Sequence, residues 1–276
     1  MSAAHPAAGG GHVPAGVDRT DGDGIATLTL RNEGRRNALA VDLFDDLDRE
    51  LDGLESDPGI RVVVITGHGS AFSVGADLAA PSHRRTLRGD SVSADLARLR
   101  RVGRIAERLH RLPQVSVAAV NGACAGAGLS LALACDLRIA ADTAVFNTAF
   151  LGAGLSGDLG GIWFATRILG QARARELFLL PGRLPARDAC AAGLVTRVSP
   201  DESFAADLAA LTTRLAGGAP RAVRAMKDNL RDADRLPLAD YLDVESERMV
   251  STFHTDDARE AAHAFLERRE PVFTGK

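Results

Sequence analysis

Short apolar runs alternate with amphipathic stretches over the first two hundred residues of the chain. Five runs rich in Val, Ile, Leu and Ala have the length of strands, and several are continuous enough to be covered on both faces: residues 25–30, 61–67, 115–122, 137–142 and 195–199. Between them, residues 41–54 carry leucines at every third or fourth position, which predicts an amphipathic helix. Further helices are predicted over residues 93–111 and from Gly126 onward. This alternation is typical of a layered α/β domain.

The pattern changes at both ends of the chain. After Pro200 the strand signals stop, and four amphipathic stretches predict a helical C-terminal region over residues 201–276. Residues 1–18 are rich in Ala, Gly, Pro and His with little apolar bulk, which predicts a disordered tail and leaves residues 19–200 as the α/β core. Because no apolar segment follows a basic start, we expect no secretory signal.

One apolar stretch has the length of a membrane span. Residues 112–135 carry no charge over 24 positions. Pro113, Gln114, Asn121 and the glycines after Asn121 divide the stretch into two short elements. We therefore interpret it as a buried strand followed by a buried helix, and we expect no association with a membrane.

Composition and charge narrow the class of protein. Hydrophobic residues make up 46% and charged residues 25% of the chain, as in ordinary globular proteins. A net charge of −3 with interspersed acids and bases argues against a nucleic-acid partner. The cysteines, Cys124, Cys135 and Cys190, lie in small apolar runs, which favours free thiols in a reducing cytoplasm over a disulfide framework. No Cys/His spacing indicates a metal site.

Three glycine-rich stretches follow apolar strands, at residues 67–78, 121–133 and 152–161. Glycine lets backbone N–H groups approach a ligand closely. Where such a turn opens a helix, the unpaired N–H groups and the helix dipole favour negative charge. Two turns of this kind are able to form an oxyanion hole.

The third stretch contains a lone carboxylate. Asp158 is the one charged residue in FLGAGLSGDLGG, residues 150–161. A buried, unpaired carboxylate is costly, so its position needs a reason. Asp158 is an N-cap of the following helix, a residue of a surface turn or a catalytic base; the cap and base roles are compatible, and all three interpretations remain open at this point.

Two short motifs suggest other kinds of functional site. GAGLSG, residues 152–157, matches a dinucleotide fingerprint, but Asp158 follows at once and would place negative charge where a pyrophosphate should lie. GLSLA, residues 128–132, is a near match to a nucleophile elbow, but Ser130 falls inside the predicted helix. We interpret Ser130 as a packing residue.

The pairing of SAFSVGADL with VNGACAGAGLSLALACDLRIA resembles the crotonase (enoyl-CoA hydratase/isomerase) superfamily. The resemblance extends to RRNAL, AGLVTRV and the last 21 residues, 256–276. It implies a spiral of β-β-α units with a C-terminal helical oligomerisation region, assembled as a homotrimer or as a hexamer of two trimers. It also implies an acyl-CoA thioester substrate, with coenzyme A as part of that substrate and no metal or redox cofactor.

The resemblance assigns roles to individual positions. The two N–H groups of the oxyanion hole would come from Val74 and Ala127. The residues that match the part of the family holding the adenine and pantetheine of CoA are Ala38, Ala76, Asp77 and Leu78, and Arg268 matches a basic position that reaches CoA from a neighbouring subunit. We expect the Asp77 side chain to position backbone rather than to act as a base.

The hydratases of this family use two glutamates, and their matching positions here are Ser130 and Phe150. Neither side chain exchanges protons with water at neutral pH, so efficient hydration is not expected. Asp158, eight residues after Phe150, matches the catalytic aspartate of dienoyl-CoA isomerases. The surrounding residues 146–164 resemble the ring-1,2-epoxyphenylacetyl-CoA isomerases, which lack both glutamates and keep the aspartate.

The sequence therefore favours an enoyl-CoA isomerase with Asp158 as the proton shuttle. Ser130, Phe150, Leu155 and Trp163 are expected to line the substrate pocket, and its apolar members to raise the pKa of Asp158. The alternatives are an enoyl-CoA hydratase of low or specialised activity and a non-catalytic acyl-CoA-binding protein. Residues 79–104 are expected to form the loop and helix on the substrate side, and His110 and His254 to lie on the surface.

Overall fold

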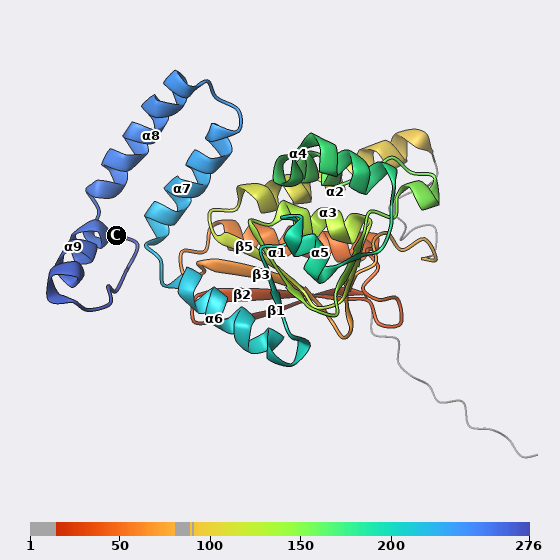
Figure 1. The fold of residues 1–276 in the computed structure, drawn as a ribbon, viewed down its shortest axis with the longest axis horizontal. Coiled ribbons are helices and arrows are strands. Elements are labelled where there is room, and N and C mark those ends of the chain that lie inside the picture. The colour runs from red at the N-terminus through yellow and green to blue at the C-terminus, as the bar shows by residue number, and fades with distance from the viewer. Residues whose placement is uncertain (1–14, 81–88, 90) are drawn as a thin grey trace, which may run out of the picture.

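The computed structural model describes residues 15–80, 89 and 91–276, which form two sheets and their covering helices (Figure 1). The larger sheet has the order β1-β2-β3-β5-β7-β10. Its strands are β1 (Gly16–Gly22), β2 (Ile25–Arg31), β3 (Val62–Gly67), β5 (Val115–Val120), β7 (Leu137–Ala141) and β10 (Arg197–Ser199). Every neighbouring pair is parallel except β1 with β2, which form an antiparallel hairpin. The five predicted strands are confirmed.

Both faces of this sheet are covered, which explains the continuous apolar runs. Along β3, Val63 and Ile65 belong to the main core beneath α1 (Val41–Glu55) and α2 (Val92–Arg111). The alternate residues Val62 and Val64 belong to a second cluster that includes side chains of α6 (Phe204–Ala216). The first helix of the C-terminal region therefore packs against the same sheet as the core.

A second sheet, of order β4-β6-β8-β9, consists of very short strands. They are β4 (Ala71–Ser73), β6 (Ala123–Ala125), β8 (Val145–Asn147) and β9 (Leu184–Pro185). Each of the first three follows a strand of the larger sheet and precedes a helix: α2, then α3 (Ala127–Ala134), then the short η2 (Leu151–Ala153) and α4 (Gly161–Leu179). This repetition confirms the predicted spiral of β-β-α units. The chain then continues through α5 (Ala186–Ala191) and η3 (Asp201–Ser203).

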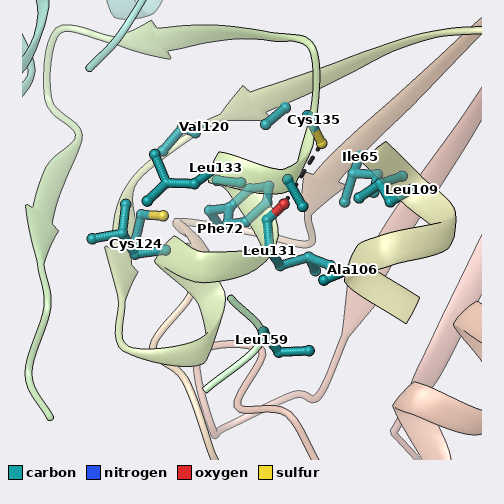
Figure 2. Packing of buried hydrophobic residues seen from close by; sticks show 14 of the residues in the cluster. Ile65, Phe72, Ala106, Leu109, Val120, Cys124, Leu131, Leu133, Cys135 and Leu159 are labelled. Atoms are coloured by element: carbon teal, nitrogen blue, oxygen red, sulfur yellow. Dashed lines mark hydrogen bonds between the residues drawn. The ribbon is translucent and has the colours of Figure 1, made fainter. Parts of the chain in front are cut away.

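Helix α3 lies inside the core, and all of its residues are buried. Figure 2 shows Leu131 and Leu133 of α3 among apolar side chains from β3, β4, β5 and α2, with Cys124 and Cys135 in the same cluster. Burial raises the pKa of the Cys135 thiol to about 12, so this thiol stays protonated. All three cysteines are free, as predicted.

The remaining helices confirm the predicted helical C-terminal region. The pair α7 (Pro220–Ala233) and α8 (Leu238–Phe253) projects beside the core, and α9 (Asp256–Glu267) follows it (Figure 1). Lys227 of α7 ties the pair to the core, because its Nζ donates to Asp136 Oδ2 at 2.5 Å and to the carbonyl of Gln114 at 2.6 Å.

The predicted disordered tail, residues 1–18, extends too far into the chain. Residues 1–14 lie outside the described residues, but Gly16 to Asp18 already belong to β1. This edge strand is polar and is held by ion pairs such as Arg31 with Asp18, so it carries no apolar strand signal. Within the described ranges, no helix is long and apolar enough to cross a membrane, and no cluster of His, Cys, Asp and Glu has the form of a metal site.

Candidate active site

Two of the glycine-rich turns meet at one edge of the second sheet. Strands β4 and β6 are parallel neighbours, so the turns that follow them leave the sheet side by side. At Gly75, φ is +91°, and an added Cβ would lie 2.9 Å from the carbonyl oxygen of Ala125 and 3.2 Å from the nitrogen of Ala127. Only glycine allows this contact, which brings the backbone of the first turn against the start of α3.

The second turn offers an unpaired N–H. Ala127 is the first residue of α3, after the N-cap Gly126. Its N–H has no acceptor within the helix, because the first intrahelical bond at this end runs from the N–H of Ser130 to the carbonyl of Gly126. Ala127 therefore meets the geometric requirement of the predicted donor.

The N–H of Val74, the donor predicted for the first turn, is already paired, so the oxyanion-hole role of Val74 stays a prediction. Its N–H donates to the carbonyl of Arg36 at 3.3 Å. The N–H of Ala76, in the same turn, is a second candidate donor. The bridge from Leu39 to this turn uses the carbonyl of Gly75 and the N–H of Asp77, so the N–H of Ala76 points to the opposite side. Among the described residues it has no hydrogen-bond acceptor.

Asp158 lies in a turn immediately before α4. Gly161, the first residue of that helix, packs directly on α3, because an added Cβ would lie 2.2 Å from Ser130 Oγ. The third glycine-rich stretch is therefore joined to the helix whose N-terminus carries Ala127. The N-cap of α4 is Gly160, with no side-chain cap bond, so the reading of Asp158 as an N-cap is excluded.

The carboxyl group of Asp158 is partly desolvated. Its Oδ1 atom is buried and has no hydrogen-bond partner among the described residues. Burial raises the pKa of this carboxyl from 3.8 to about 6, as predicted from its apolar surroundings. A carboxyl group with such a pKa is ionised at neutral pH and is a stronger base than an exposed aspartate.

The predicted pocket residues separate into two groups. Ser130 is buried in α3, Phe150 stacks on Phe178 with ring centroids 6.4 Å apart, and Leu155 packs against the same apolar cluster. Trp163 lies in a hollow of about 1000 Å³ between α2, α4 and α7, whose lining includes Leu159 and Gly160, the two residues that follow Asp158. His110 lies in the same hollow and is half-buried, so its predicted surface position is wrong; His254 is exposed, as predicted.

Four of the residues expected to contact CoA lie together. The bridge between Leu39 and Ala76 places Ala38 beside residues 76–78. Asp77 accepts hydrogen bonds from Asn32 Nδ2 at 3.3 Å and from the N–H of Ala79 at 3.1 Å, which agrees with a positioning role. Leu78 is 63% exposed beside them.

Arg268 is not part of this group within the chain. It is an exposed residue at the end of α9, and Figure 1 places α9 beyond the α7–α8 pair, away from the core. Of the predicted substrate-side segment 79–104, residues 81–88 and 90 lie outside the described residues, and the remainder supplies the first part of α2.

Comparison with known proteins decides the family. The profile of the family described as enoyl-CoA hydratase/isomerase matches residues 20–276. The chain belongs to the enoyl-CoA hydratase/isomerase family. The predicted resemblance is thereby confirmed, and the family acts on acyl-CoA substrates.

The relatives that match this chain include proteins named isomerases and proteins named hydratases. The chain is 32% identical to a trans-2-decenoyl-[acyl-carrier-protein] isomerase of Streptococcus mutans, over 92% of this chain and 96% of the relative. It is 35% identical to the 1,2-epoxyphenylacetyl-CoA isomerase of Escherichia coli, with the same coverage of both. The crystal structure of an enoyl-CoA hydratase from Polaromonas sp. JS666 superposes with a TM-score of 0.87 at 32% identity, over 94% of this chain and 100% of that one. These relatives include both isomerases and a hydratase, so membership of the family does not define the reaction.

Proposed function

We propose that this protein is an enoyl-CoA isomerase in which Asp158 moves a proton between two carbons of the acyl group. The observation that carries the proposal is the half-buried carboxyl group of Asp158, whose Oδ1 atom is buried without a hydrogen-bond partner among the described residues, because desolvating a carboxylate without a partner is costly and needs a functional reason. Pure binding of a thioester gives no such reason.

The thioester carbonyl would accept hydrogen bonds from the N–H groups of Ala76 and Ala127. Removal of a C2 proton from a 3-enoyl thioester by Asp158 gives a dienolate whose negative charge rests on that carbonyl oxygen. The double bond between C3 and C4 shifts to C2 and C3 when the same carboxyl group returns the proton to C4. The net reaction moves one proton and one double bond, and it consumes no co-reactant.

Hydration is disfavoured by the side chains at the two positions where hydratases carry glutamate. Ser130 is buried, and its Oγ donates to the carbonyl of Gly126 at 3.4 Å. Phe150 is buried against Phe178. A single carboxyl group suffices for a proton shift, whereas activating water and protonating the product uses two groups in these hydratases.

We also propose that the protein assembles as a trimer or a pair of trimers in the cytoplasm. Helices α8 and α9 expose large apolar side chains, among them Phe253 at 67%, Phe265 at 82% and Leu266 at 77%. Such side chains favour burial against other subunits. A neighbouring subunit would then also explain how Arg268 reaches CoA. The three free thiols, of which those of Cys124 and Cys135 are buried, suit a reducing compartment.

The reaction is tested by supplying purified protein with a 3-enoyl-CoA and, separately, with a 2-enoyl-CoA. We expect the first to give the absorbance of the conjugated 2-enoyl thioester, and the second to give little 3-hydroxyacyl-CoA. Rapid hydration of the 2-enoyl-CoA would favour the hydratase alternative. Binding of both thioesters without turnover of either would favour the non-catalytic alternative.

The raised pKa of Asp158 predicts the pH dependence of the isomerisation. The base must be ionised, so kcat/KM should be flat above the pKa of the free enzyme and fall about tenfold per pH unit below it. The midpoint of this acid limb is expected near pH 6, because burial raises the pKa of Asp158 to about 6. A profile from pH 4 to 9 measures it. An acid limb centred near the ordinary aspartate value of 3.8 would contradict a buried base.

A further inference from the structure

A cluster of three rings joins α2 to the first turn of α4. His110, in the last turn of α2, lies with its ring centroid 5.5 Å from that of Trp163 and 5.4 Å from that of Phe164, both edge to face. The rings of Trp163 and Phe164 are themselves 5.0 Å apart and nearly perpendicular. Such pairs are favourable beyond their buried area, so the cluster fixes one helix against the other.

The same cluster reaches the turn that carries Asp158. An added Cβ on Gly160 would lie 3.2 Å from Phe164 Cε2, so the ring of Phe164 lies directly against this residue. The N–H of Phe164 also donates to the carbonyl of Gly160 at 3.0 Å. On another side of the turn, Gly161 contacts Ser130 of α3. The turn is thus confined between α3 and the ring cluster.

This turn needs such support because its backbone is strained. Leu159 has a φ of +48°, in the left-handed region that costs a side-chain-bearing residue roughly 1–2 kcal/mol. Gly157 and Gly160 on either side have φ values of +119° and +71°. No side-chain hydrogen bond caps α4, and the Asp158 Oδ1 atom has no partner among the described residues. The backbone of Asp158 is held by the N–H of Gly161, which donates to its carbonyl at 3.0 Å, and packing therefore contributes to where the side chain lies.

His110 is suited to act as a neutral ring. Burial lowers its pKa, and the cations Arg231, Lys227 and Arg111 lower it further, against an opposing effect of Asp136. Arg231 and Lys227 reach it from α7, Arg111 from its own helix, and Asp136 from the end of α3.

We propose that His110 is a positioning residue that holds the Asp158 carboxyl group in place through Phe164 and Gly160. The effect of His110 on the rate of isomerisation rests on the proposed function. Its effect on the environment, and so on the pKa, of the Asp158 carboxyl group does not. Without the ring of His110, Phe164 loses an edge-to-face contact. The turn then relaxes, more water reaches Asp158, and the carboxyl group leaves the geometry needed for proton transfer.

The experiment compares His110→Ala with His110→Phe, which keeps a ring, and with His263→Ala, which alters an exposed histidine on α9. The pKa of Asp158 is read by carbon-13 NMR of aspartate-labelled protein, with the signal assigned by its loss in Asp158→Asn. The parameters kcat and KM for a 3-enoyl-CoA are measured on the same samples. Should His110→Ala unfold, His110→Gln removes the ring and keeps much of the side-chain volume.

We expect His110→Ala to move the pKa of Asp158 from about 6 towards 3.8. Its kcat should fall about 10- to 100-fold, with little change in KM, because small displacements of a catalytic group have effects of this size. His110→Phe and His263→Ala should keep both quantities close to those of the wild type. An unchanged pKa and kcat in His110→Ala, or equal losses in His110→Phe, would overturn the inference. If the wild type isomerises no enoyl thioester, the proposed function fails, while the NMR comparison still decides the role of His110.

Discussion

Replacing Asp158 by asparagine is expected to lower kcat on a 3-enoyl-CoA at least about a hundredfold, the usual contribution of a general base. Asparagine has the same shape but accepts no proton at neutral pH. Binding of the thioester should be retained, because the N–H groups of Ala76 and Ala127 and the residues expected to contact CoA are unaffected. Equal activity in the wild type and the variant would show that the base lies elsewhere.

The same substitution is expected to stabilise the protein above pH 6. The folded-state pKa of Asp158 is raised to about 6 from 3.8, so folding favours the protonated form. The contribution of this protonation to the stability of the fold is complete below pH 3.8 and is lost as the pH rises through 6. At higher pH the ionised carboxyl group is less favourable to the fold than the protonated one by about 3 kcal/mol. Asp158→Asn should therefore raise the melting temperature by a few degrees at pH 8.

Two comparisons isolate this effect. The gain in melting temperature should vanish at pH 4, where the wild-type carboxyl group is protonated in the fold. Asp240→Asn, which changes an exposed acid on α8, should alter neither the rate nor the melting temperature. A lower melting temperature for Asp158→Asn at pH 8 would indicate that the carboxylate has a stabilising partner.

Replacing Ala127 by proline is expected to remove one donor of the oxyanion hole while leaving α3 intact. Ala127 is the first residue of the helix, where proline is tolerated because its missing N–H has no helical acceptor. Loss of one such donor should lower kcat about 10²–10³-fold.

The matched control is Ala127→Gly, which keeps the N–H and removes one methyl group, and which should retain activity within a few-fold. Melting temperatures of both variants show whether α3 is preserved. A proline variant that folds and keeps full activity would mean that the carbonyl is held by other groups. Circular dichroism and steady-state kinetics on the same preparations are sufficient.

The parts of the fold that follow from the sequence are those with a long hydrophobic pattern. Strand β3 and helix α1 are examples, because burial imposes a period on many residues at once. Strands β4, β6, β8 and β9 have two or three residues each, too few for any period to be visible. Strand β1 was missed because its edge position leaves it polar.

The residues of the candidate site are likewise predictable only where the local sequence pattern marks them. Asp158 was identifiable as a single charge in an apolar stretch, and the start of α3 as a turn opening a buried helix. The sequence does not reveal which of Val74 and Ala76 has an unpaired N–H, because this depends on which N–H donates to the distant carbonyl of Arg36. The position of His110 against α4 is likewise a tertiary contact between residues more than fifty positions apart.

The two proposed carbonyl-binding donors, Ala76 and Ala127, are main-chain groups, and this has an evolutionary consequence. Apart from proline, no substitution deletes a peptide N–H, so the capacity to activate a thioester resists mutational drift. Side chains around it, such as Ser130, Phe150 and Asp158, are exchangeable one at a time. Descendants of such a fold would keep their class of substrate while changing reaction in single steps, so shared ancestry is a better guide to what these proteins bind than to what they make of it.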